Sequence, residues 1–102
     1  MHTLVVLYSP PADPDKFRSY YTSTHLKLVA KMPGLRAYRY GFDLAPPAGD
    51  SPYWAMFEAD FDDINALSAA MSSPEGQAVA ADVPNYADQA PVMFSFDVIK
   101  GD

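Results

Sequence analysis

The stretch "FRSYYTSTHLKLVAKMPGL", residues 17–35, decides where the first helix of this chain lies. Asp13 and Pro14 predict the start of that helix, as an N-cap followed by a proline at the first helical position. Pro33-Gly34 predicts its end, because proline disfavours helical geometry in the residue before it and glycine adopts the left-handed turn that follows many helices. Steps of three and four residues, typical of an amphipathic helix, separate the members of its expected buried face: Phe17, Tyr20, Tyr21, Thr24, Leu28 and Met32.

Four segments rich in β-branched and aromatic residues predict strands around this helix. A second helical region, capped by Asp62 or Asp63 and again by Ser73, separates the last two strands. The expected strands are residues 3–9, 35–44, 53–61 and 91–100. This order of elements predicts an α+β, ferredoxin-like βαββαβ fold with a four-stranded antiparallel sheet, covered by helices on one face.

Large apolar side chains occupy both faces of the expected strands. In residues 35–44, Tyr38, Tyr40 and Phe42 share one face, and in residues 53–61 both Phe57 and Trp54 are large although they point to opposite faces. A monomer covers only one face of its sheet with helices. We therefore expect a second copy of the chain to cover the other face, which makes a homodimer.

Length and composition limit the possible classes of protein. The 102 residues predict a single domain, residues 1–102, and 49% hydrophobic residues suffice for a core. The absence of cysteine excludes disulfides and thiolate chemistry, and the net charge of −6 argues against nucleic acid as a partner. The apolar N-terminal run is too short for a signal peptide or a membrane span, so we expect a cytoplasmic protein without a membrane partner.

Three motifs give the chain a resemblance to a known family. They are "FRSYYTSTHLKLVAKMPGLRAY", "FEADFDD" at the end of the hairpin, and "SSPEGQAVAADVPNYAD" before the last strand. Together they resemble the EthD-like proteins of the dimeric α+β barrel group, named for a protein linked to ethyl tert-butyl ether degradation. The family commonly has Trp after the first tyrosine and a His-x-Pro-Leu run, whereas this chain has Tyr21 and "HLKL", which leaves the helix without a proline kink after His25.

The resemblance implies a homodimeric α+β barrel with a pocket between the helices and the sheet of each subunit. It does not fix a reaction, because related barrels carry several chemistries. We interpret the chain as a cofactor-free enzyme of isomerase, cyclase or oxygenase type, acting on a small apolar or aromatic organic molecule in a degradation pathway. The alternatives are a non-catalytic ligand-binding or accessory protein to an oxygenase, and a haem-binding monooxygenase relative.

His25 is the residue to which we assign any catalysis. It borders the apolar face of its helix one turn from Tyr21, and an imidazole there exchanges protons near neutral pH. The alternative is that His25 hydrogen-bonds a backbone carbonyl and completes the core. Tyr21 is expected to hydrogen-bond a ring nitrogen of His25 or an oxygen of the substrate. The remaining expected substrate-binding residues, which also suit core or dimer packing, are Tyr38, Tyr40, Trp54 and Phe94.

The other polar residues receive structural roles. Asp82 and Asp97 are candidates to orient His25, but we favour a surface acid and an edge-strand charge, respectively. Glu58 is expected to pair with Arg36 or Arg39. His2, the second histidine, is expected at a mobile terminus, which leaves no multi-histidine metal site within one chain.

Overall fold

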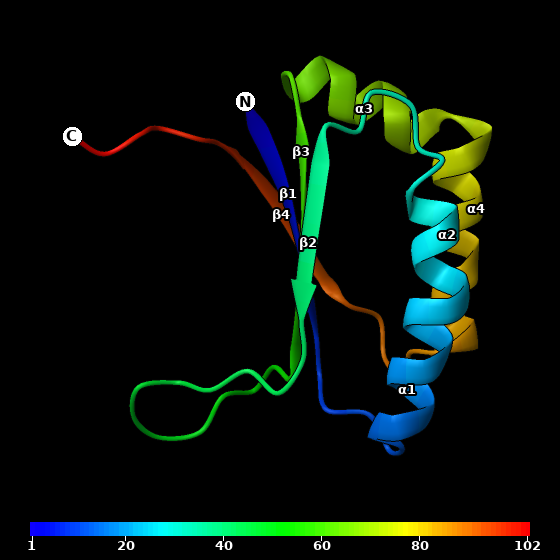
Figure 1. Cartoon of the computed structure of the whole chain (residues 1–102), viewed down its shortest axis with the longest axis vertical. Helices are drawn as coiled ribbons and strands as arrows, with labels where there is room; N and C mark the ends of the chain where they lie inside the picture. The colour runs from blue at the N-terminus through cyan, green and yellow to red at the C-terminus, as the bar shows by residue number, and fades with distance from the viewer.

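The computed structural model describes all residues from Met1 to Asp102 and has the predicted order of elements. Four strands form one sheet, and two helical segments lie on one side of it (Figure 1). The strands are β1 (His2–Tyr8), β2 (Ala37–Gly41), β3 (Ala55–Phe61) and β4 (Val92–Asp97). The helical elements are α1 (Pro14–Tyr20), η1 (Tyr21–His25), α2 (Leu26–Val29), α3 (Ile64–Ser72), α4 (Pro74–Asp82) and η2 (Val83–Asn85).

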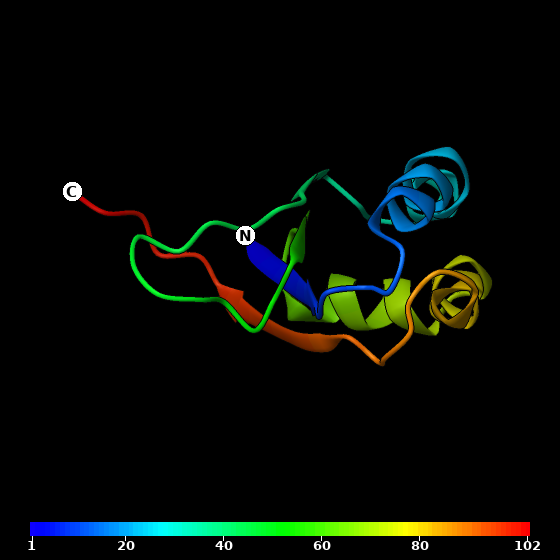
Figure 2. The same ribbon diagram turned by 90° about the horizontal axis from the view of Figure 1, so that it is seen from below.

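The sheet has the order β2-β3-β1-β4, and all neighbouring strands are antiparallel. Seen from below, the helices lie on one side of this sheet, while the loop between β2 and β3 and the C-terminal tail project to the other (Figure 2). This arrangement confirms the ferredoxin-like α+β prediction. β1 keeps its predicted length but begins and ends one residue earlier, whereas β2, β3 and β4 are shorter than predicted because their flanking residues belong to the loops.

The predicted caps act as expected at three helix starts. The Asp13 side chain accepts from the Lys16 N–H at the start of α1, and the Asp63 side chain accepts from the Ala66 N–H at the start of α3. At the start of α4, the Ser73 hydroxyl accepts from the Gly76 N–H. Each bond satisfies a backbone donor that the first turn of a helix leaves unpaired.

The first helix differs from the prediction in its middle. The Leu26 N–H donates to the Tyr21 carbonyl, five residues back, so η1 is a π-helical turn between α1 and α2. The wider turn rotates the following residues, which leaves Thr24 exposed and Leu28 half-buried where the sequence predicted a buried face. The buried positions after Tyr21 are His25, Leu26, Val29 and Met32.

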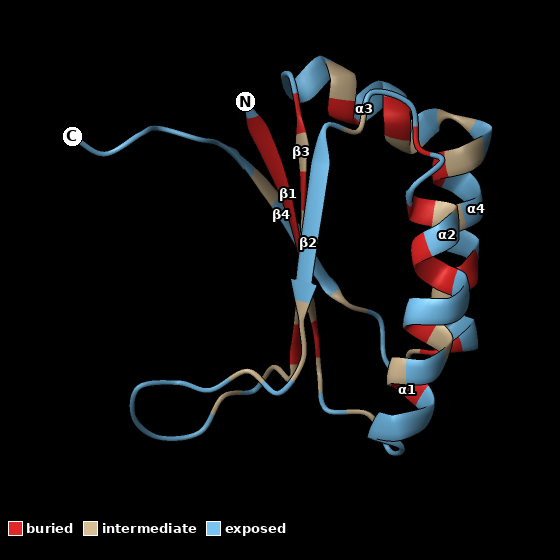
Figure 3. Ribbon diagram, viewed as in Figure 1, coloured by how far each residue is buried: buried red, intermediate tan, exposed pale blue.

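The core lies between the helices and the facing side of β1 and β3 (Figure 3). In β3 the alternate residues from Ala55 to Phe61 are buried, as the period of two requires. The apolar residues of the core come from both the sheet and the helical side: Leu4, Val6, Tyr8, Phe17, Tyr21, Leu26, Val29, Met32, Ala55, Phe57, Ala59, Phe61, Leu67, Ala70 and Tyr86.

The opposite face of the sheet carries no helix, and we call it the open face. Its part over β4 exposes Val92, Phe94 and Phe96. Its part over β2 and β3 is polar, since Arg39 donates to Glu58 at 2.7 Å and to Asp60 at 3.0 Å. The predicted ion pair of Glu58 is thus confirmed with Arg39, and the apolar character of the open face is concentrated on β4.

The predicted setting of His2 was wrong. It lies inside β1 and is buried, whereas the sequence suggested a mobile terminus. Its Nδ1 lies 2.7 Å from Asp97 Oδ1 and its Nε2 lies 2.8 Å from Ser95 Oγ. Both partners are in β4, which pairs with β1, so strand pairing holds this histidine in place.

Candidate functional site

A cavity of about 260 Å³ lies between the sheet and the helices. The side chains that line it are apolar except for Tyr8, Tyr21 and His25. A ligand inside would therefore bury an apolar body and find its polar partners at one wall. The apolar lining residues come mainly from β1, β3, α2 and α4: Leu4, Val6, Val29, Met32, Phe57, Ala59, Phe61, Met71, Val79, Ala80, Val83, Ala90, Pro91 and Met93.

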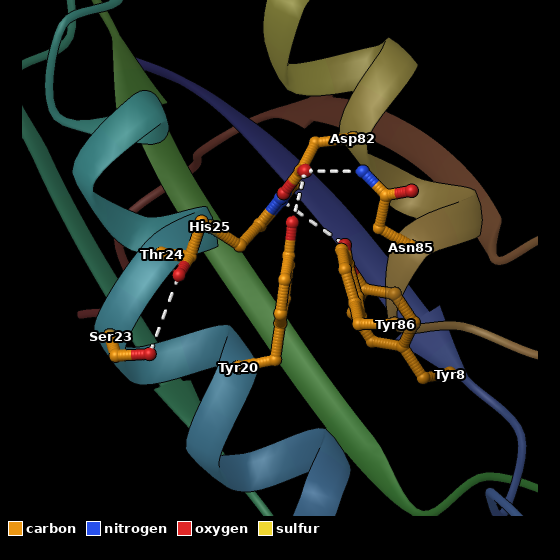
Figure 4. Close-up of polar contacts among 8 residues, drawn as sticks. All are labelled: Tyr8, Tyr20, Ser23, Thr24, His25, Asp82, Asn85 and Tyr86. Carbon is orange, nitrogen blue, oxygen red and sulfur yellow. Dashed lines mark hydrogen bonds and ion pairs between the residues drawn. The ribbon is translucent and has the colours of Figure 1, made fainter.

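His25 and Asp82 form a buried pair at this polar wall (Figure 4). His25 Nδ1 lies 2.9 Å from Asp82 Oδ2, and only 3% of the histidine and 8% of the aspartate are exposed. A carboxylate accepts hydrogen bonds and does not donate them, so the Nδ1 nitrogen carries the proton. The predicted surface position of Asp82 is wrong, because the side chain is buried.

Asp82 has two further donors that fix its position. The Tyr20 hydroxyl donates to Asp82 Oδ1 at 2.6 Å, and the Asn85 amide donates to the same oxygen at 2.9 Å. The helix rotation that places Asp82 inward also aligns Asn85, three residues later, with it. The carboxylate is thus satisfied on both oxygens, which is what a buried charge requires.

Two tyrosines complete the polar wall. Tyr86 Oη lies 3.1 Å from His25 Nε2, and Tyr8 Oη lies 2.8 Å from Tyr86 Oη. Because Nδ1 carries the proton of neutral His25, Nε2 is the acceptor and the Tyr86 hydroxyl is the donor. The histidine therefore bonds two side chains, and the alternative of a histidine bonded to a backbone carbonyl does not describe it.

The environment sets the protonation states of the pair. Burial lowers the pKa of His25 below its ordinary value, and the bond to Asp82 offsets only part of this. Burial alone would raise the pKa of Asp82, but the hydrogen bonds from Tyr20, Asn85 and His25 hold that pKa below its ordinary value. The resting pair at neutral pH is thus a neutral imidazole beside a carboxylate, and such an imidazole is able to accept a proton.

The predicted site residues separate into two groups. Tyr21 and His25 meet at the cavity, with ring centroids 5.2 Å apart. The other four do not line it. Tyr38 stacks on Phe57 and is partly exposed, and Tyr40 packs 6.0 Å from the Tyr21 ring.

Trp54 and Phe94 are also absent from the cavity lining. Trp54 packs against Phe17, its indole N–H donates to Asp43, and the Arg18 guanidinium lies 5.1 Å from its ring. Phe94 lies on the open face, on the far side of the sheet. These positions suit packing, the other role that the sequence allowed for them.

Four members of the polar wall were not predicted from the sequence, namely Tyr8, Tyr20, Asn85 and Tyr86. One signal was present in "DVPNY", residues 82–86, where an acid, an amide and a tyrosine fall within one helical turn of each other. No group of three or more His, Cys, Asp or Glu side chains is arranged to bind a metal ion. No helix has the length and apolar character needed to cross a membrane.

Comparison with known sequences decides the family. The sequence model of the EthD domain matches residues 9–90. The chain belongs to the EthD family. An uncharacterised 11.0 kDa protein from the thcB-thcC intergenic region of Rhodococcus erythropolis is 33% identical over 101 residues, which cover 95% of this chain and 94% of that relative. The family resemblance in the sequence is thus confirmed.

A solved structure of the same family agrees with this assignment. A crystal structure of an EthD family protein from Bacillus halodurans has a TM-score of 0.89 and 31% identity, and the match covers 97% of this chain and 99% of that one. A dimeric ferredoxin-like protein of unknown function from Thermobifida fusca shares the fold alone, with a TM-score of 0.67 and 24% identity, covering 95% and 89% of the two chains.

Another structure of low sequence identity also shares the fold alone. It is a variant of SnoaB, a cofactor-independent oxygenase from Streptomyces nogalater, with a TM-score of 0.68 and 17% identity, covering 98% of this chain and 94% of that one. The EthD-family chain therefore has a fold on which at least one oxygenase works without a cofactor.

Proposed function

We propose that this EthD-family protein is a homodimeric, cofactor-free enzyme that removes a proton from a small, mainly apolar organic molecule. His25 is the base, and the substrate is an aromatic or otherwise apolar compound with one acidic hydroxyl, such as a phenol or an enol. The observation that carries the proposal is the His25–Asp82 pair at the only polar wall of an apolar cavity.

The chemistry follows from the two members of the pair. Neutral His25 accepts the proton, and Asp82 stabilises the resulting imidazolium through the 2.9 Å bond to Nδ1. The substrate anion is electron-rich and is the species that isomerisation, cyclisation or reaction with O₂ requires. The apolar walls exclude water from this anion.

The dimer is part of the proposal. The apolar side chains of β4 are exposed to solvent in the single chain, and a partner would bury them. The β2–β3 loop and the C-terminal tail project on the same side of the sheet (Figures 1 and 2). A second copy placed against the open face would bury Phe94 and Phe96 and leave the cavity on the other side of each sheet accessible.

A specific observation favours a second candidate, a non-catalytic binding protein. Both ring nitrogens of His25 are occupied, as they are in a histidine that only completes a structure. The same observation weighs against a haem site, since an iron ligand needs the Nε2 lone pair that accepts from Tyr86. Ligand binding without turnover would select the binding protein.

The test is a panel of small phenols, naphthols and hydroquinones offered to the purified protein in air. Binding is followed by amide NMR shifts, and conversion by O₂ uptake and mass spectrometry. We expect at least one compound to bind and to be converted, and His25→Gln to keep the binding and lose the conversion. A panel that binds but is never converted would refute the enzymatic proposal and support the binding protein.

A further inference from the structure

Neither ring nitrogen of His25 is free to touch a ligand in the cavity. Nδ1 bonds Asp82 and Nε2 bonds Tyr86, so the edge of the ring that remains beside the cavity consists of carbon atoms. If His25 is the base, as proposed above, the proton must reach it through another group. The structure contains one connected route to Nε2, and it consists of tyrosine hydroxyls.

The hydrogen bonds along this route have one direction. The Tyr86 hydroxyl donates its only proton to His25 Nε2. Its oxygen is therefore the acceptor in the 2.8 Å bond between Tyr8 Oη and Tyr86 Oη, and Tyr8 is the donor. The Tyr8 oxygen has two lone pairs, and the neighbouring hydroxyl of Tyr21 fills at most one of them. Tyr8 is therefore the hydroxyl of this route that keeps a free acceptor lone pair, and Tyr8 lines the cavity.

We propose that Tyr8 is the catalytic residue that contacts the substrate hydroxyl, and that it passes the substrate proton through Tyr86 to His25. The substrate O–H bond breaks and its proton bonds to Tyr8 Oη. The former Tyr8 proton moves to Tyr86 Oη, and the former Tyr86 proton moves to His25 Nε2. The products are a substrate anion beside the neutral Tyr8 hydroxyl and an imidazolium beside the Asp82 carboxylate, so no oxidant or cofactor enters the step.

The tyrosines suit a relay in which all protons move together. Burial raises the pKa of Tyr8, with partial offsets from the hydroxyls of Tyr86 and Tyr21, and burial together with Tyr8 also raises the pKa of Tyr86. Neither residue holds a phenolate charge at neutral pH, so each has a proton to give when it receives one. The net charge transfer is only between substrate and His25.

The other side of the relay faces solvent. Tyr20, Asn85 and Tyr86 line an outer groove of about 260 Å³ between α1 and η2, separate from the cavity. Tyr20 and Asn85 also bond Asp82. The polar wall thus spans the distance from the cavity to the groove, which gives the imidazolium a way to lose its proton to water after the reaction.

The experiment uses 4-nitrophenol, whose anion absorbs visible light, as a probe of the ionisation of a bound phenol. The full-length protein in excess is titrated with pH, and the apparent pKa of the bound probe is read from its absorbance. The variants are Tyr8→Phe, Tyr86→Phe and His25→Gln. Tyr53→Phe, a tyrosine outside the cavity and the groove, is the control. Melting temperature and amide NMR spectra report whether each variant folds.

We expect the wild type and Tyr53→Phe to ionise the probe alike. Tyr8→Phe, Tyr86→Phe and His25→Gln should each reduce the ionisation constant of the bound probe about tenfold or more, which is one or more pKa units, because each breaks the relay. If Tyr86→Phe ionises the probe as well as the wild type does while His25→Gln fails, His25 acts directly. The relay is then wrong and the proposed function stands.

The other possible results of the titration also test the relay and the proposed function. An unchanged constant in Tyr8→Phe removes Tyr8 from the reaction and overturns the relay. An unchanged constant in His25→Gln removes the base, which overturns the proposed function together with the relay. If Tyr8→Phe does not fold, the comparison of Tyr86→Phe with His25→Gln still separates a relay from direct contact, because only a relay needs the middle hydroxyl.

Discussion

Asp82 Oδ2 lies 2.9 Å from His25 Nδ1, although the two residues are 57 positions apart and belong to different helices. The pair therefore ties α4 to η1. Because Asp82 also accepts from Tyr20 and Asn85, its carboxylate serves three donors. A neutral amide at this position has one acceptor oxygen and brings two donor hydrogens of its own.

Asp82→Asn should destabilise the protein by about 1–3 kcal/mol, the usual cost of leaving buried polar groups without partners. It should also lower the pKa of His25 further, since the bond and charge of Asp82 now raise it. Urea denaturation measures the first effect, and NMR titration of the imidazole measures the second. Asp50→Asn, in the exposed β2–β3 loop, is the matched control and should change neither. An unaltered His25 pKa would show that the pair is not formed in solution.

The lowered pKa of His25 predicts a loss of stability in weak acid. Below the ordinary histidine pKa of about 6.5 the unfolded chain takes up a proton at this residue, whereas the folded protein resists it. The free energy of unfolding should therefore fall between pH 7 and pH 5, with a slope of at most about 1.4 kcal/mol per pH unit from this residue. His25→Gln should show a flatter profile. Parallel profiles for the two proteins would contradict the buried neutral state.

These predictions depend on features of the site that the sequence alone predicts only in part. The start of α1 at Asp13–Pro14 and the end of α2 before Gly34, which has a φ of 75°, were predictable because capping and turn preferences act locally. The pairing of Glu58 with Arg39 was predictable because the two face each other across the hairpin strands. Local rules thus describe most of the fold.

The polar wall is harder to predict because its members meet only in the folded protein. Whether Asp82 points inward depends on how α4 rotates against α2, which no spacing within α4 reveals. The π-helical turn was missed for a related reason. The sequence pattern favoured Thr24 on the buried face, and one additional residue in the turn places His25 there instead, in contact with Asp82 and Tyr86.

The proposed dimer predicts an effect of charge on the open face. Phe94→Glu places a carboxylate among the exposed apolar residues of β4, which a partner would bury, so the variant should be a monomer at micromolar concentration. Ala78→Glu adds the same charge to the exposed side of α4 and should leave the dimer intact. Sedimentation velocity compares both with the wild type. A wild-type monomer, or a dimeric Phe94→Glu, would refute assembly through this face.

A last prediction concerns the close approach of α3 and α4 at Gly76. A Cβ atom at this position would lie 2.0 Å from the carbonyl oxygen of Ala70 and 2.8 Å from that of Met71, and both are backbone atoms that cannot rotate away. Gly76→Ala must therefore push the start of α4 outward. We expect a loss of about 1–3 kcal/mol in the free energy of unfolding, the typical cost of overpacking.

The displacement of α4 should also change the candidate site, because Asp82 is the last residue of this helix. We expect the imidazole NMR signals of His25 to shift in Gly76→Ala and ligand binding in the cavity, which Gly76 also lines, to weaken. Gly41→Ala is the control, since a Cβ there meets no atom within 4 Å and the residue lies in β2. Urea denaturation and NMR spectra of the two variants give the answer. Equal stability of both would mean that α3 and α4 do not approach as closely as the 2.0 Å distance requires.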